Sequence, residues 1–238
     1  MSSTPSADAR RDEVAAGLAR VRERIATACA AADRRPEEVT LTVVTKYFPP
    51  SDVARLADLG VTDVGENKHQ EAADKRPEVP QPLRWHFIGG LQSNKAAAVT
   101  RWADVVESVD RIKLVGRLAG GAAEREAPLD VLVQVSLDPP GAAGRAGAAP
   151  ADVPALAEAI ATAGTLRLRG VMGVAPLGED PAAAFARLAD VAAEVRRDHP
   201  DATWVSAGMS GDLEQAIAAG ATHVRVGSAV LGPRPVIK

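Results

Sequence analysis

The spacing of apolar residues divides the chain into two patterns. Val14, Leu18, Val21 and Ile25 recur at intervals of three and four residues, which predicts an amphipathic helix that continues to about residue 32. After that helix, short apolar runs typical of strands alternate with Ala- and Leu-rich stretches typical of helices. This alternation predicts an α/β fold, because strands that are joined by helical crossovers pair in parallel.

Eight strands and seven connecting helices are predicted from this alternation. The strands span Leu41–Lys46, Val61–Glu66, Arg84–Gly89, Asp104–Val109, Asp130–Leu137, Leu166–Val174, Thr203–Met209 and Thr222–Gly227. The helices span Pro50–Leu59, Lys68–Arg76, Asn94–Trp102, Arg111–Glu126, Ala151–Ala163, Pro181–Asp198 and Gly211–Ala219. Eight such units in about 200 residues have the number and size of a (β/α)8 TIM barrel with an extra N-terminal helix. An open doubly wound sheet is less favoured, because no glycine-rich dinucleotide motif follows the first strand.

The connections between these elements carry two further signals. Gly60 and Gly220 each end a predicted helix shortly before a strand, where glycine tolerates the left-handed conformation of a helix cap. The segment Pro139–Pro150 is too rich in Gly and Pro to be helical. It follows the fifth strand on the face where barrels place their functional loops, so it is either a lid or a solvated loop.

The composition fits one soluble domain. Of the 238 residues, 46% are hydrophobic and 25% are charged, which is ordinary for a globular protein. Aromatic residues make up only 3%, so Ala, Val, Leu and Ile must build the core. We expect residues 1–12 to form a disordered N-terminus and residues 13–238 to form a single barrel domain.

Charge, cysteine content and hydropathy exclude several classes of protein. The net charge of −3 and the lack of a Lys/Arg-rich run argue against a nucleic-acid partner. Cys29 is the only cysteine, so no intramolecular disulfide can form, as in a reducing cytoplasm. No secretory signal precedes residue 12, and no apolar run is long enough to span a membrane. We therefore expect a cytoplasmic protein, and a monomer.

Lys46 is the first candidate for chemistry. It closes an apolar strand, where a cation is costly without a partner or a lowered pKa. A lysine amine must be neutral to attack an aldehyde, and partial burial at a barrel mouth favours the neutral form. A lysine at a strand end more often reaches to solvent, so this position alone does not establish a Schiff base.

Two Gly/Ser-rich turns follow the seventh and eighth predicted strands. Ser206–Asp212 leads into a helix, and Arg225–Ser228 ends the last strand. Barrels commonly bind phosphate with these two loops, although turn geometry and helix capping also explain each glycine singly. Strand alternation places Val224 and Val226 in the layer under the helices, and it sends Arg225 and Gly227 into the lumen.

His86 is the other candidate, beside the end of the third strand. A ligand-contacting histidine and a satisfied interior histidine are equally compatible with this position. The remaining histidines, His69, His199 and His223, have no ligand-like spacing, so no metal site is expected.

Six segments together resemble the pyridoxal phosphate homeostasis proteins, also called YggS-like. The segments are Val44-Thr45-Lys46, Gly65-Glu66-Asn67, Trp85–Gly89, Leu91–Lys95, Gly208-Met209-Ser210 with Asp212, and Val224–Ser228. They occur in the family's order from about Leu41 to Gly232, which makes the set far more specific than any one motif. Two departures stand out: Phe48 and Arg145 occupy places where many members have lysines, which puts a secondary cofactor site in doubt.

The resemblance implies an alanine-racemase-like barrel without the C-terminal β-domain, carrying pyridoxal 5′-phosphate (PLP) covalently on Lys46. It implies phosphate binding by Ser210, Gly211, Gly227 and Ser228, with Arg225 near the pyridine ring. Three residues of the matching segments complete the expected cofactor-binding set: Asn67, His86 and Met209. The resemblance also implies a protein that holds and supplies PLP in vitamin B6 and amino-acid homeostasis, with apo forms of PLP-dependent enzymes as candidate partners.

Two enzymatic alternatives share this chemistry. A PLP-dependent racemase needs a second acid/base opposite the lysine, which similar racemases supply as a tyrosine together with a second domain. The chain ends at Lys238 without room for such a domain, and its only tyrosine, Tyr47, neighbours Lys46 and points to the opposite face. We therefore expect no catalytic residue beyond the Schiff-base lysine and at most weak racemase activity. A cofactor-free Schiff-base aldolase is the second alternative.

Overall fold

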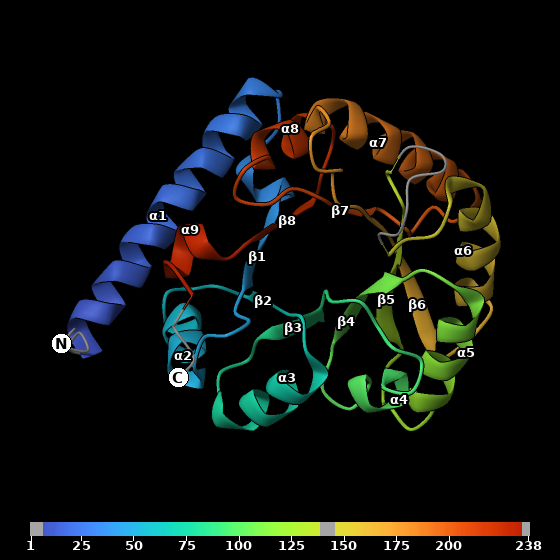
Figure 1. Ribbon diagram of the computed structural model, residues 1–238, viewed down its shortest axis with the longest axis horizontal. Coiled ribbons are helices and arrows are strands. Elements are labelled where there is room, and N and C mark those ends of the chain that lie inside the picture. Colours follow the sequence, from blue (N-terminus) through green and yellow to red (C-terminus); the bar gives the residue numbers. More distant parts are fainter. Residues whose placement is uncertain (1–6, 139–145, 235–238) are drawn as a thin grey trace.

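A closed parallel barrel of eight strands forms the centre of the computed structural model, which describes residues 7–138 and 146–234. The strands lie in chain order around the barrel, and β1 closes it by pairing with β8 (Figure 1). Their bounds are β1 Thr40–Val44, β2 Asp63–Glu66, β3 Arg84–Phe87, β4 Val105–Val109, β5 Leu129–Gln134, β6 Leu166–Met172, β7 Trp204–Ser206 and β8 His223–Val226. The predicted (β/α)8 barrel is confirmed.

Helices surround the barrel on its outer side (Figure 1). Their bounds are α1 Ala7–Ala31, α2 Pro50–Asp58, α3 His69–Lys75, α4 Ala96–Val99, α5 Ile112–Gly121, α6 Val153–Ala161, α7 Pro181–Asp198, α8 Leu213–Ala218 and α9 Ser228–Leu231. Short 3-10 turns occupy Pro36–Glu38, Arg76–Glu78 and Pro150–Asp152. None of the described helices is long and apolar enough to cross a membrane.

The N-terminal helix begins earlier than the sequence suggested. Residues 7–12 were expected to be disordered, but they form the first turns of α1. Arg10 holds this end in place: its Nη2 donates to Asp52 Oδ2 at 2.8 Å and to the Leu231 carbonyl at 2.9 Å. These partners are 42 and 221 residues away in sequence, so local hydropathy gave no sign of them.

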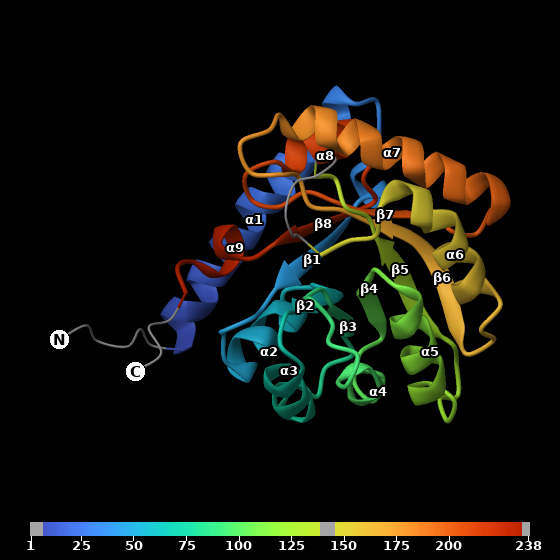
Figure 2. The ribbon, with the colours of Figure 1, turned by 45° about the vertical axis from the view of Figure 1, so that its right-hand side comes forward.

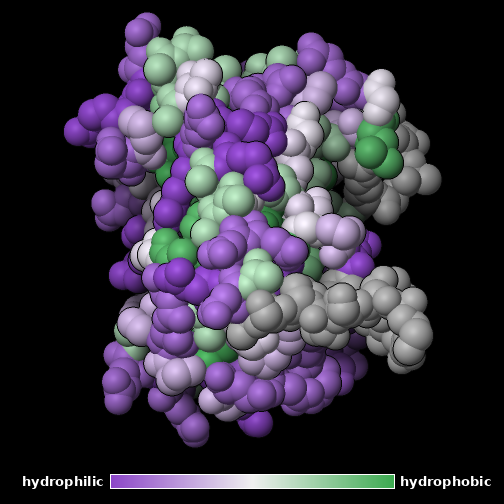
Figure 3. Space-filling view, turned by 90° about the vertical axis from the view of Figure 1, so that its left-hand side faces the viewer, coloured by the Kyte–Doolittle hydropathy of each residue, from purple (hydrophilic) through white to green (hydrophobic). Residues whose placement is uncertain are grey.

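Helix α1 covers the side of the barrel formed by the last elements of the chain. It packs along α8 and α9, next to each other in both ribbon views (Figure 2). Gly17 permits this approach, because a Cβ there would lie 2.2 Å from the Val230 carbonyl oxygen. The apolar residues of α1, Val14, Leu18, Val21 and Ile25, are buried. Mostly hydrophilic residues cover the outer face of the molecule on this side (Figure 3).

Strand alternation separates two environments. Val43, Val64, Val224 and Val226 are fully buried in the layer between barrel and helices, as predicted for the last two. The lumen is apolar on one side, where Val105, Leu132 and Met172 form a small separate cluster. The other side of the lumen is polar, so the interior of this barrel can present charged groups to its C-terminal mouth.

The two helix caps predicted at glycines are confirmed, whereas most of the loop after β5 lies outside the described residues. Gly60 and Gly220 have φ of 77° and 94°, the left-handed conformation expected of the helix caps. In the loop from Pro139 to Pro150, residues 139–145 lie outside the described residues. In the described part, Ala148 forms a parallel bridge with Val135 and so extends the pairing beyond β5.

Candidate functional site

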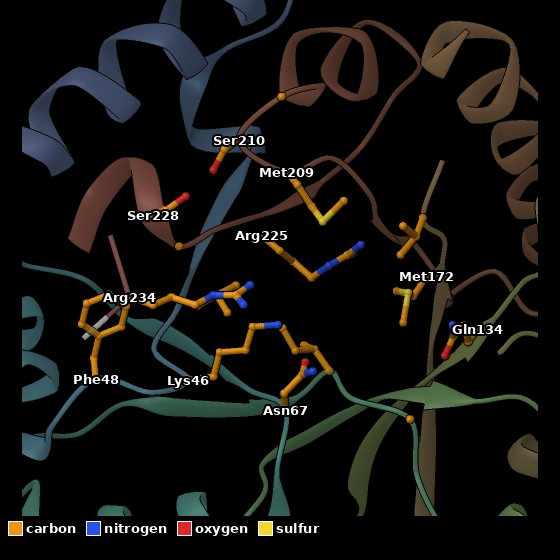
Figure 4. A pocket seen from close by; sticks show the side chains of 16 residues that line it. Lys46, Phe48, Asn67, Gln134, Met172, Met209, Ser210, Arg225, Ser228 and Arg234 are labelled. Carbon is orange, nitrogen blue, oxygen red and sulfur yellow. The ribbon is translucent and has the colours of Figure 1, made fainter. Parts of the chain in front are cut away.

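A cavity of about 430 Å³ opens at the C-terminal ends of the strands. Figure 4 shows Lys46 and Asn67 on one side, Ser210 and Ser228 on another, and Arg225 extending between them. Eight of the nine predicted cofactor-binding residues line this cavity: Lys46, Asn67, Met209, Ser210, Gly211, Arg225, Gly227 and Ser228. Residues that lie up to 182 positions apart in sequence, from Lys46 to Ser228, are thus brought together by barrel closure.

Lys46 follows β1 and lies half-buried at the cavity wall. Burial lowers the pKa of Lys46, and the nearby charge of Arg234 lowers it further, whereas Glu66 and Glu71 oppose these effects. The net direction favours the neutral amine, which is the form that attacks an aldehyde.

A buried ion cluster fixes the backbone on both sides of Lys46. Lys75 Nζ donates to the Thr45 carbonyl at 3.0 Å and to Glu66 Oε1 at 2.5 Å. Glu71 Oε1 accepts from Lys75 Nζ at 3.2 Å and from the Tyr47 backbone N–H at 2.5 Å. Tyr47 has a φ of 71°, which is rare for a residue with a side chain. The cluster therefore stabilises a tight turn that directs Lys46 into the cavity and leaves Tyr47 outside its lining.

The two Gly/Ser turns meet at one side of the cavity. Gly227 lies so close to β1 that a Cβ there would be 3.1 Å from the Val44 carbonyl oxygen. The other turn is held by Asp212 Oδ1, which accepts from the Met209 backbone N–H at 2.6 Å. Hydroxyls of Ser210 and Ser228 and the backbone of the two turns thus face a common space, which is suited to an anion.

Arg225 is buried, and it forms the deep wall of the cavity. Its Nη1 donates to Ser206 Oγ at 2.6 Å, and its Nη2 donates to the Gly173 carbonyl at 2.9 Å. Burial lowers the pKa of Arg225 while Glu107 opposes that effect, and an arginine remains protonated in any case. The remaining N–H groups of the guanidinium can therefore donate to a ligand.

His86 does not line the cavity. It is fully buried in the barrel lumen, with Glu107 Oε1 2.6 Å from Nδ1 and Asp63 Oδ1 2.9 Å from Nε2. Both ring nitrogens are thus occupied by carboxylates, and the geometry favours the satisfied interior histidine over direct contact with a cofactor.

Eight further lining residues were not in the predicted cofactor-binding set. They are Val44, Phe48, Ile88, Gly90, Gln134, Met172, Val174 and Arg234. Phe48, one of the two departures from the family pattern, is buried. Arg145, the other departure, lies outside the described residues. The guanidinium of Arg234 lies 5.2 Å from the ring of Tyr47. No periodicity marks these positions, because each comes from a loop or strand end that only the closed barrel brings to the mouth.

The donor set fits PLP. A neutralised lysine, a rigid arginine and a glycine cradle with two hydroxyls could hold an aldehyde, a ring acceptor and a phosphate in turn. Among the described lining residues, only Lys46, Arg225 and Arg234 are ionisable, so the cavity has no carboxylate, histidine or tyrosine. The described residues also contain no group of three or more His, Cys, Asp or Glu side chains that could hold a metal ion.

Comparisons with known proteins agree with this geometry. Residues 17–235 match the family described as alanine racemase, N-terminal domain. The pyridoxal phosphate homeostasis protein of Mycobacterium leprae is 41% identical, over 94% of this chain and 94% of its own length. The Pseudomonas aeruginosa protein of the same name is 42% identical, over 93% and 96%.

A solved structure is similar to this chain in both sequence and fold. PipY of Synechococcus elongatus, whose structure was determined with PLP bound, is 33% identical and superposes with a TM-score of 0.78. The superposition covers 92% of this chain and 100% of PipY. The chain therefore belongs to the alanine racemase N-terminal domain family and, within it, to the pyridoxal phosphate homeostasis proteins.

Proposed function

We propose that this protein binds PLP as a Schiff base on Lys46 and takes part in intracellular PLP and amino-acid homeostasis. The observation that carries the proposal is the cavity itself, which joins a lysine of lowered pKa to two glycine turns and a buried arginine. The PLP-bound structure of PipY and the names of the relatives support the same cofactor and role.

Each wall of the cavity has a role in this proposal. Lys46 would supply the amine for the cofactor's aldehyde. Ser210, Gly211, Gly227 and Ser228 would hold the phosphate. Arg225 would face the ring nitrogen and disfavour its protonation, which would weaken the ring as an electron sink. The protein would retain PLP while damping carbanion chemistry.

The described lining of the cavity holds no second acid/base, which supports a carrier over a racemase. A two-base racemisation needs a proton donor on the face opposite the lysine. The described lining opposite Lys46 includes Gln134, Met172 and Val174, none of which exchanges a proton near neutral pH. The relatives are named as homeostasis proteins, in agreement with this proposal.

The absorbance of the protein tests the PLP proposal. We expect purified or PLP-reconstituted protein to be yellow, borohydride to remove the colour, and peptide mapping to find the reduced adduct on Lys46. Lys46→Ala should abolish the adduct, whereas Lys68→Ala, which removes an exposed lysine near the same mouth, should leave it intact. A protein that stays colourless with added PLP contradicts the proposal and favours a cofactor-free aldolase.

Two further assays separate the roles. Incubation with L-alanine in deuterated water should leave Cα–H unexchanged, and rapid exchange with racemisation would favour the enzyme. Mixing the PLP-loaded protein with an apo PLP-dependent enzyme should restore that enzyme's activity faster than spontaneous release of PLP allows. Equal rates would contradict a role in supplying the cofactor.

The proposal also includes a monomer of one barrel domain that is located in the cytoplasm. Gel filtration tests the oligomeric state, and cell fractionation tests the location.

A further inference from the structure

A line of buried polar side chains crosses the barrel lumen behind the cavity. Arg225 Nη1 donates to Ser206 Oγ, and Ser206 Oγ donates to Glu107 Oε2, both at 2.6 Å. The other carboxylate oxygen of Glu107 contacts His86, whose far nitrogen contacts Asp63. None of these five residues is more than 4% exposed. The line therefore runs without interruption from the cavity wall to the first residue of β2, at the opposite end of the barrel.

Charges alternate along this line. Burial by itself would raise the pKa of Glu107, but the hydrogen bond and charge of His86, with the charge of Arg225, lower it to about 2. Burial would likewise lower the pKa of His86, but the hydrogen bonds and charges of Asp63 and Glu107 raise it to about 9. At neutral pH the order is cation, anion, cation, anion, so the line carries no net charge.

Other ionisable groups also face His86. The ring of His223 lies 6.4 Å away, centroid to centroid, and burial lowers its pKa to about 4, so it is neutral. Arg84 Nη1 lies 3.6 Å from Asp63 Oδ1 and is about half exposed. These neighbours leave the Asp63–His86–Glu107 arrangement intact at neutral pH.

Two carboxylates compete for Arg225. Glu107 Oε2 lies 3.7 Å from Arg225 Nη1 on the lumen side, beyond Ser206. Asp212, in the turn that would bind phosphate, also attracts Arg225. Attraction between opposite charges is strong in a buried site, where water screens it little. The Gly173 carbonyl holds Nη2 of Arg225, so loss of the charge of Glu107 would loosen the Ser206 side of the guanidinium and leave Asp212 as the remaining negative charge that draws it towards the phosphate turn.

We propose that Glu107 is a positioning residue that acts through Ser206 to hold the Arg225 guanidinium against the wall that would face the cofactor ring. His86 and Asp63 stabilise Glu107 as the anion that this task requires. The inference rests on the proposed function, and it names the group that controls the electrostatic environment of the ring.

A double-mutant cycle tests this coupling. We expect Glu107→Gln to weaken PLP binding about tenfold when Arg225 is present, within the range of coupling between residues of one hydrogen-bond network. In an Arg225→Gln background, Glu107→Gln should not weaken PLP binding further, because Glu107 affects the cofactor only through Arg225. Equal weakening in both backgrounds would show a merely structural role and overturn the inference.

The absorbance of the bound cofactor gives a second readout. Between neutral and mildly acidic pH the band of the wild-type protein should stay unchanged, because Arg225 keeps the ring nitrogen unprotonated. In Glu107→Gln the displaced guanidinium should free that nitrogen, so the band should change as the pH falls. A pH-independent band in the variant contradicts the proposal.

Two variants serve as controls. Ser206→Ala removes the bridging hydroxyl and keeps the carboxylate, so it should reproduce the coupling to Arg225 even if Glu107→Gln does not fold. Thr42→Val removes a buried hydroxyl that has no partner among the described residues, and it should change neither affinity nor band. If the wild-type protein forms no coloured adduct, the proposed function fails; if it does and the cycle is additive, only this inference fails.

Discussion

The charge of Lys46 depends on a balance between burial and three neighbouring charged groups. Burial lowers its pKa, and Arg234 adds to that effect from the mouth of the cavity. Glu66 and Glu71 oppose it, but both accept hydrogen bonds from Lys75, which offsets much of their negative potential. Lys75 therefore has two tasks: it holds the turn in place, and it keeps the nearby carboxylates from charging Lys46.

Arg234 offers a test of this balance at a single position. Arg234→Gln removes a nearby positive charge, so the pKa of Lys46 should rise and its neutral fraction should fall. The rate of Schiff-base formation at neutral pH should then drop about two- to threefold, a modest effect because Arg234 is exposed and screened by salt. Stopped-flow absorbance measures this rate. Arg234→Lys keeps the charge and should react like the wild type; an equal loss in both variants would indicate a contact and not a charge effect.

Some site residues could be predicted from sequence because a local pattern marks them. Lys46 ends an apolar strand, and Ser210 and Gly227 lie in small-residue turns at known barrel positions. His86 had no such mark: the carboxylates that occupy its ring come from positions 21 and 23 residues away and depend on barrel register. Arg234 was missed for the same reason, since its place at the mouth follows from the path of the chain after α9.

At the scale of elements, the turns after the strands decide where lining residues point. Asn67, after β2, is packed against the turn after β3, where a Cβ on Gly89 would lie 2.2 Å from the Asn67 carbonyl oxygen. A Cβ added at the adjacent Gly90 would meet no atom within 4 Å. One glycine of this pair is thus required by close approach of two backbones, and the other is not.

Substitution of these two glycines separates the effects. Gly89→Ala should force the two turns apart, lower the free energy of unfolding by about 1–3 kcal/mol and weaken PLP binding through displaced Asn67. Gly90→Ala should leave the unfolding free energy within about 0.5 kcal/mol of the wild type. Urea denaturation of the two variants measures the difference, and equal stabilities would show that the Gly89 turn can relax at little cost.

Element type was easier to predict than element extent. Helix α7 was predicted with its exact bounds, Pro181–Asp198. In the structure the Asp180 side chain caps its start by accepting from the Ala182 N–H at 3.0 Å, and Pro181 occupies the first helical position. Helix α9, Ser228–Leu231, was missed because four residues are too few to show a helical period. Strands were predicted too long at their ends, where alternation continues into loops that have left the barrel.

At the scale of the molecule, the lumen combines a cofactor site with a buried ionic core. Buried ions stabilise a fold only while their partners keep the matching charge. Asp63, His86 and Glu107 satisfy one another in this way. Burial by itself would raise the pKa of Asp63, but the hydrogen bond and charge of His86 lower it below its usual value. The stability of the whole barrel should therefore follow the titration of its interior.

The pH dependence of unfolding tests this last point. His86 has a folded pKa of about 9, above its unfolded value of 6.5, so its contribution is complete below pH 6.5 and is lost as the pH rises through 9. His223 has a folded pKa of about 4, below 6.5, so it must charge on unfolding in acid and stability falls as the pH drops below 6.5. Glu107 adds a loss as the pH falls from 4.5 through about 2. The free energy of unfolding should therefore peak near pH 6.5.

The alkaline side of this curve isolates His86. Linkage predicts a loss on the order of 3 kcal/mol from His86 between pH 6.5 and 9, measured by urea denaturation of the apo protein. His86→Gln should be less stable at neutral pH and should lack this alkaline loss, while His223→Gln should keep it and lose part of the acid decline. If His86→Gln does not fold, a nitrogen-15 NMR titration of the wild type answers the same question. An imidazole that is neutral at pH 7 would contradict the alternating charges, because Glu107 and Asp63 would then lie buried without the cation between them.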